Sequence, residues 1–318
     1  MLEARSSLEI APSAAGMQDA ETTEYQVTCC LYRQGDDLLS LIIQINQLIK
    51  VVQKHRGASM GVLAGDESFT KDLDTLQQHM ARRLAMLECF ARSTGGLLSD
   101  RDKQNLHLAW ATIRHDWQDD NVSDNFELHT HLIEQLQVML VSLAKKLEQP
   151  FSADPEAGEA LAGGDTAYPR HFKKIEMLNF IARQLPDMIE QLAKVRGLSV
   201  YAASIGSVDF YNDRKLRFLL QCTREQSDKL RGQAERINEQ LAGGFSALQA
   251  FKNIELKLLY LLNTVEQDVL SGLDISTGSQ QYFTLATEII DVYWKVVSDG
   301  LLQVRQWQQE DLDDWLRQ

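Results

Sequence analysis

Apolar side chains recur along most of the chain at steps of three and four residues, the spacing of one face of an α-helix. The clearest run starts at Gln34 and predicts a helix to about Leu63. Similar runs predict seven more helices, at about 69–93, 100–117, 124–147, 172–203, 212–241, 245–270 and 279–315. The alternation of apolar and polar residues typical of strands is scarce, which excludes an all-β fold.

Proline and glycine divide this pattern into two halves. The segment 149–169 holds three of the five prolines and is expected to be a linker. It separates residues 34–148 from residues 170–318, and residues 1–33 are expected to form a flexible tail. Amphipathic helices with short connections favour antiparallel bundles. The sequence therefore predicts an all-α protein of two four-helix bundles in series, with a kink or restart at Pro186 of the fifth helix.

Composition narrows the range of partners. The 318 residues include 32 Lys and Arg against 45 Asp and Glu, a net charge of −13, so neither nucleic acid nor an anionic membrane is an expected partner. The four cysteines form no CxxC pattern, which indicates reduced thiols. No stretch of 18 apolar residues occurs without charges. We expect a cytoplasmic protein that does not span a membrane.

The two halves share an internal repeat. At an offset of 140 residues (Arg56 to Arg196), five identities fall within eleven positions. The shared element, Lys-x-Arg-Gly-x-Ser, lies late in the first helix of each half and indicates a duplication. It covers residues 54–59 and 194–199.

Glycine inside a helix costs about 1 kcal/mol relative to alanine, so each Arg-Gly pair needs a compensating role. One interpretation is an anion clamp, in which Gly57 and Gly197 admit a ligand beside the planar donor forks of Arg56 and Arg196. The other is that each glycine permits close helix packing while each arginine bridges a buried carboxylate. The spacing alone does not separate these two hypotheses.

Together with segments 126–147 and 184–197, the Arg-Gly elements resemble the nitrate- and nitrite-sensing (NIT) domain of bacterial antiterminators and receptors. The resemblance implies two four-helix bundles with nitrate or nitrite held at their junction by Arg56 and Arg196. It also implies a conformational signal to an output module, here expected to be a separate protein. The family's first clamp can have adjacent arginines, whereas this chain has His55 before Arg56.

The predicted site contains no cofactor and no metal ion, because the Glu-x-x-His pattern of di-iron bundles is absent. His129 and His131 point apart on a helix and are expected at the surface or at a cap. No motif pairs a nucleophile with a base, so we do not expect an enzyme. The candidate ligand-binding residues are Arg56, Arg196, Gly57, Gly197 and His55, followed by Lys54, Ser59, Lys194, Ser199, Lys252 and Lys257, with Arg231 and Arg236 as alternatives for a further cation.

A second hypothesis is a helical adaptor that binds another protein and no small ligand. A buried carboxylate opposite each arginine would favour that alternative. The Leu-rich helix faces are compatible with a homodimer.

Overall fold

The computed structural model describes residues 14–149, 170–241 and 247–317, with side chains from residue 25 onward except at 247 and 248. The helices of the first half are α1 (Ala14–Leu63), α2 (Thr70–Ser93), α3 (Asp100–Arg114) and α4 (Val122–Leu147). Those of the second half are α6 (Arg170–Asn179), α7 (Leu185–Ile205), α8 (Phe210–Gln240), α9 (Ala247–Thr264) and α10 (Ser279–Leu316). These ranges contain no strand, which confirms the all-α prediction.

Helix α1 is the largest departure from the prediction. It begins at Ala14, so residues 14–33, which the sequence places in a flexible tail, are helical. From Tyr25 onward this part of α1 is held by long-range contacts: Tyr25 packs on Trp315 of α10, with ring centroids 6.0 Å apart, and the Tyr32 hydroxyl donates to Gln309 at 2.6 Å. The predicted linker lies outside the described residues except for its first position.

Local capping explains several helix boundaries. The Ser99 side chain accepts a hydrogen bond from the Asp102 amide, as expected for the predicted cap of α3. Helix α4 begins earlier than predicted because Asn121, rather than Ser123, supplies its capping oxygen. Near Pro186 the fifth helix neither breaks nor restarts: a π-helical turn, η3 (Phe180–Gln184), joins α6 to α7. Such a turn accommodates the missing proline amide within a continuous helix.

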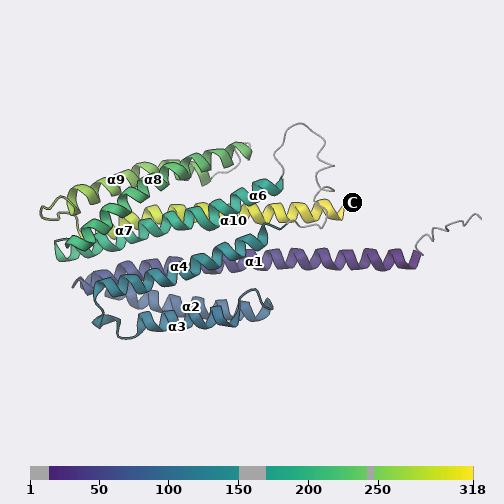
Figure 1. The fold of residues 1–318 in the computed structure, drawn as a ribbon, viewed down its shortest axis with the longest axis horizontal. Coiled ribbons are helices and arrows are strands. Elements are labelled where there is room, and N and C mark those ends of the chain that lie inside the picture. Colours follow the sequence, from purple (N-terminus) through teal and green to yellow (C-terminus); the bar gives the residue numbers. More distant parts are fainter. Residues whose placement is uncertain (1–13, 150–169, 242–246, 318) are drawn as a thin grey trace, which may run out of the picture.

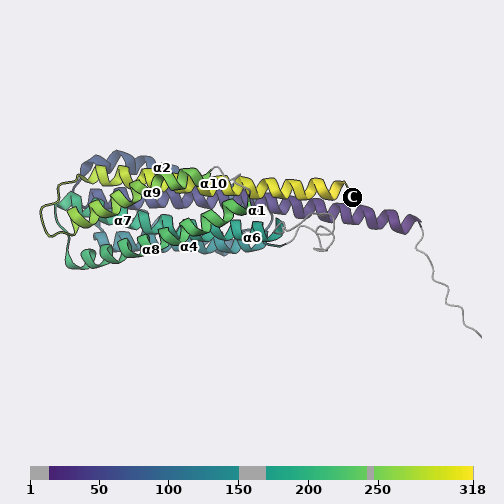
Figure 2. The ribbon, with the colours of Figure 1, turned by 90° about the horizontal axis from the view of Figure 1, so that it is seen from above.

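The two halves lie side by side, with α1 and α4 between α2 and α3 on one side and α7 and α10 on the other (Figure 1). Helix α1 contacts α2 and α4 of its own half and α7 and α10 of the other half. Helices α8 and α9 cover the far side of α7 and α10. At one end, α1 and α10 run antiparallel past the other helices (Figures 1 and 2).

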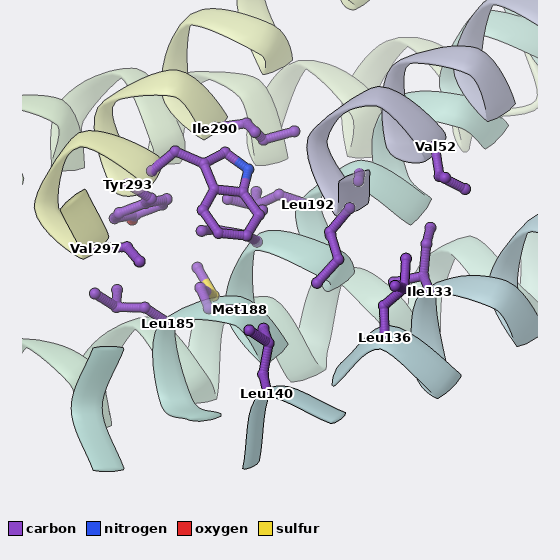
Figure 3. Packing of buried hydrophobic residues seen from close by; sticks show 14 of the residues in the cluster. Val52, Ile133, Leu136, Leu140, Leu185, Met188, Leu192, Ile290, Tyr293 and Val297 are labelled. Atoms are coloured by element: carbon purple, nitrogen blue, oxygen red, sulfur yellow. The ribbon is translucent and has the colours of Figure 1, made fainter. Parts of the chain in front are cut away.

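One apolar core joins the halves. Figure 3 shows Leu136 of α4, Met188 and Leu192 of α7, and Ile290 and Tyr293 of α10 pointing into the same interior. All five are essentially inaccessible to solvent. Helices α1, α4, α7 and α10 therefore surround the centre of the molecule.

None of the described helices combines the length and the apolar character needed to cross a membrane. The four cysteines are free, in agreement with the prediction of unpaired thiols.

Candidate anion-binding site

The two arginines of the repeat lie among the four central helices. Arg56 on α1 and Arg196 on α7 are 0% and 1% exposed, although arginine is rarely buried so completely. A guanidinium taken out of water needs hydrogen-bond partners and, in most proteins, an opposite charge. The two arginines meet this requirement differently.

Arg56 has a carboxylate partner and hydrogen bonds on both terminal nitrogens, while its Nε has no partner. Its Nη1 and Nη2 donate to the two carboxylate oxygens of Glu190 on α7, at 2.7 and 3.1 Å. Nη1 also donates to Thr130 on α4 at 3.0 Å, and the guanidinium lies over the Phe126 ring. The Gln53 side chain donates to Glu190 at 2.9 Å and holds the carboxylate in place. For this arginine, the carboxylate bridge of the alternative hypothesis is present.

Arg196 has hydrogen bonds but no carboxylate. Nη1 donates to Thr287 of α10 at 2.9 Å and Nη2 donates to the Gln53 carbonyl at 2.6 Å, while Nε has no partner. The guanidinium lies over the Phe283 ring. Among the described residues, no Asp or Glu oxygen lies within 4.0 Å of its nitrogens. Burial, reinforced by the nearby Arg56 charge, lowers the pKa of Arg196 to about 9.

The two glycines of the repeat allow close helix approach. A Cβ on Gly57 would lie 3.1 Å from the Phe283 ring and 3.3 Å from Nε of Arg196. A Cβ on Gly197 would lie 2.9 Å from the Met60 sulfur. The absence of a side chain at Gly57 lets Arg196 approach the backbone of α1, and its absence at Gly197 lets Met60 approach the backbone of α7.

His55 takes part in a separate buried pair. Its Nδ1 lies 2.8 Å from Nε2 of His129, whose Nδ1 lies 2.6 Å from the Asn125 carbonyl. Burial and the Arg114 charge lower the pKa of His55 to about 3, and burial holds the pKa of His129 well below its usual value. His55 is therefore neutral and bonded to His129. The expected surface or capping position of His129 was wrong, whereas His131 is exposed.

Four lower-ranked candidates surround the arginines. Lys194 lies 3.9 Å from Glu190 and 4.0 Å from Glu134. Lys54 lies 3.5 Å from Asp291 of α10. Both lysines are at the partly exposed rim of the cluster.

The two serines of the repeat differ. The Ser59 hydroxyl donates to Oδ1 of Asn125 at 2.7 Å, and the Arg56 carbonyl of its own helix lies 3.1 Å from it. The Ser199 hydroxyl is fully buried and has no hydrogen-bond partner.

The remaining candidate cations lie apart from the cluster, on the exposed faces of α8 and α9. Lys252 pairs with Glu235 at 3.5 Å and Lys257 with Glu288 at 3.0 Å. Arg231 pairs with Glu255, and Arg236 donates to Gln233. The structure does not bring these four side chains to Arg56 and Arg196, because helix periodicity directs them outward.

Sequence reasoning missed Glu190, Gln53 and the two threonines that bind the arginines. A signal for the threonines exists: Phe-x-Leu-x-Thr occurs at 126–130 and again at 283–287. These F-x-L-x-T elements are 157 positions apart, so the offset of 140 used for the arginines does not reveal them. No comparable sequence signal marks Glu190 or Gln53.

No group of three or more His, Cys, Asp or Glu side chains in the described ranges is arranged to hold a metal ion. Comparisons with protein-family models, curated proteins and solved structures give no match to this chain. The geometry of the arginine cluster is accordingly the basis for a functional assignment.

Proposed function

We propose that the protein is a sensor that binds a small oxyanion, nitrate or nitrite, at the Arg56–Arg196 cluster between its two halves. The observation that carries this proposal is Arg196, a buried cation with no carboxylate partner in the described chain. Arg56, Glu190 and Arg196 together carry one net positive charge. A bound monovalent anion would neutralise the cluster and stabilise its buried charges.

The chemistry of nitrate suits such a site. Nitrate is planar and monovalent and offers three acceptor oxygens, so guanidinium forks bind it without proton transfer. Each charge-assisted hydrogen bond contributes roughly 1.5–3 kcal/mol. A few such bonds, less the costs of desolvation and ordering, reach the roughly 8 kcal/mol of a micromolar dissociation constant.

A signal needs two arrangements of the protein that bind the anion differently. Arg56 is on α1, and Thr287 and Phe283, which contact Arg196, are on α10. These two helices continue to the end of the molecule where Tyr25 packs on Trp315. An anion that shifts α1 against α10 would change this end, which a separate cytoplasmic signalling protein would detect.

Duplication of a four-helix unit accounts for the repeat. In this proposal α1–α4 and α6–α10 descend from one bundle, and each contributes one arginine to the junction. Paired arginines from two equivalent units are consistent with a ligand site between them.

The adaptor hypothesis draws support from the Arg56–Glu190 bridge alone. In that case the cluster would be structural and no small ligand would bind. Arg196 argues against it, because a purely structural bridge would be expected to include a carboxylate at that position too.

Isothermal titration calorimetry tests the proposal. The protein is titrated with nitrate, nitrite, sulfate and chloride, beside Arg196→Met and the surface control Arg231→Met. We expect saturable nitrate or nitrite binding in the parent and the control, and its loss in Arg196→Met. Absence of binding of every anion to a folded parent protein would refute the sensor and leave the adaptor.

A further inference from the structure

The two arginines are held by equivalent contacts. Each donates through Nη1 to the threonine, and lies over the phenylalanine, of the F-x-L-x-T element in the last helix of its own half. Arg56 uses element 126–130 on α4, and Arg196 uses element 283–287 on α10. Positions on α1 thus correspond to positions on α7 at an offset of 140, and positions on α4 to positions on α10 at an offset of 157.

The rim lysines extend this correspondence across the junction. Lys54 pairs with Asp291, and Lys194 lies at 4.0 Å from Glu134. The lysines are equivalent at the first offset, and the two acidic residues are equivalent at the second. Each lysine therefore reaches to the other half in the same way.

The correspondence fails at one place in the cluster. Glu190 of α7 supplies the carboxylate for Arg56, and the equivalent position on α1 is Lys50. Lys50 turns to Asp291, at 3.7 Å, and supplies no carboxylate to Arg196. Arg196 thus lacks the partner that the equivalent arginine has.

Arg196 retains the donors for such a partner. A guanidinium has five N–H groups, and Arg196 uses one on each terminal nitrogen, for Thr287 and the Gln53 carbonyl. One N–H on each terminal nitrogen remains, together with the Nε–H, which is unpaired in Arg56 as well. In Arg56, the terminal nitrogens bind the two oxygens of Glu190.

We propose that one monovalent planar oxyanion per chain binds Arg196 in the position equivalent to that of the Glu190 carboxylate at Arg56. Glu190 is the built-in counter-ion that closes the equivalent position at Arg56 to the ligand. This inference rests on the proposed function and adds the stoichiometry, the charge of the ligand and the residue that restricts binding to one site.

The charge of the cluster selects the class of ligand. Nitrate and nitrite resemble a carboxylate such as formate in carrying one negative charge over coplanar oxygens, so each of these anions leaves the cluster neutral. Sulfate would leave a net negative charge in a buried site. Chloride has the right charge but accepts no bidentate fork in the manner of a carboxylate.

Two pairs of variants test the inference by calorimetric titration with nitrate and nitrite. Lys50→Glu places a carboxylate at the position equivalent to Glu190, and Lys50→Met is its control. Glu190→Ala removes the side chain that occupies the position at Arg56, and Glu134→Ala, on the exposed rim, is its control. Circular dichroism and thermal melts confirm that each variant is folded.

We expect one site in the parent protein and in both controls. Lys50→Glu should bind at least about tenfold more weakly, because the internal carboxylate competes at high effective concentration. Glu190→Ala should bind two anions per chain. Parent-like binding in both Lys50→Glu and Glu190→Ala, or equal affinity of the parent for sulfate, would overturn the inference while leaving the anion sensor intact. If neither the parent nor Glu190→Ala binds any anion, the proposed function fails, and the inference fails with it.

Discussion

At the scale of single residues, the two arginines of the repeat have the same sequence context but different electrostatic situations. Arg56 is neutralised by a bidentate carboxylate, whereas Arg196 is buried with neutral acceptors only. Removing a residue from a buried ion pair leaves the other charge unpaired in the interior. Removing an unpaired charge leaves no such defect.

The two arginines should therefore differ in their effect on stability. We expect Arg56→Met to lower the free energy of unfolding by about 3–5 kcal/mol, because Glu190 stays buried without its partner. Arg196→Met should cost about 1 kcal/mol or less, because the loss of its hydrogen bonds is offset by removal of a buried charge that has no carboxylate partner. Urea denaturation in a buffer without added nitrate measures both. An equal loss in the two variants would contradict this assignment of charges.

The buried histidine pair predicts a dependence of stability on pH. In the unfolded chain, histidine takes up a proton below pH about 6.5, whereas in the folded chain the pKa of His55 is about 3 and that of His129 is also lowered. The unfolded state therefore binds more protons in this window, and stability falls as the pH falls. Each imidazole contributes up to about 1.4 kcal/mol per pH unit.

Replacing both partners, His55→Leu with His129→Leu, should flatten the dependence between pH 6.5 and 4, measured as urea midpoints at several pH values. His131→Gln, an exposed position on the same helix, is the control and should keep the parent slope. A double variant that loses stability in acid as steeply as the parent would show that other groups are responsible.

At the scale of elements, glycines decide how closely the helices pack. A Cβ on Gly300 of α10 would lie 2.6 Å from Cγ2 of Ile181 in the π-helical turn η3. Ile181 is fully buried and β-branched, so it has little freedom to move. Gly232, inside α8, has no neighbouring atom within 4 Å of its Cβ position.

The same substitution should therefore have opposite effects at these two glycines. Gly232→Ala should raise the free energy of unfolding by about 0.5–1 kcal/mol, because alanine favours the helix and nothing opposes its methyl group. Gly300→Ala should lower it by about 1–3 kcal/mol through overpacking. Thermal melts of the two variants beside the parent measure the difference. Stabilisation by both would mean that α10 and η3 are less tightly packed than the structure shows.

At the scale of the whole molecule, the two halves share one core and one charged cluster. Side chains of α4, α7 and α10 interdigitate in the centre of the molecule (Figure 3), and Arg56 and Glu190 join α1 to α7. Separating the halves would expose this apolar surface to water and break the buried ion pair. The halves therefore depend on each other for stability.

We expect the parent protein to unfold in a single cooperative transition. In differential scanning calorimetry, the calorimetric and van't Hoff enthalpies should agree, as for a two-state domain. Saturating nitrate should shift the whole transition upward, because a ligand that binds only the folded state stabilises it. Two resolved transitions would show instead that each half folds independently.

The helical class, most helix boundaries and the choice of the two arginines as candidate residues could be predicted from the sequence. These features follow from local rules: a three- and four-residue period, a side-chain cap such as Ser99, and identity at a fixed offset. The helical start of α1 at Ala14 was not predictable in this way, because the part near residue 25 is held by Trp315 of α10.

The pairing of charges, in contrast, depends on how the helices pack. Glu190 is one of many acidic residues on helices, and nothing local distinguishes it until α7 packs on α1 and carries its carboxylate to Arg56. The same packing buries Arg196 against the Gln53 carbonyl and the neutral Thr287 side chain. Arg196 receives no carboxylate, because the position on α1 that is equivalent to Glu190 holds Lys50. Helix periodicity sets which face a side chain occupies, but burial and charge pairing depend on the neighbour that covers that face. The chemistry of the candidate site is therefore a property of the packed halves.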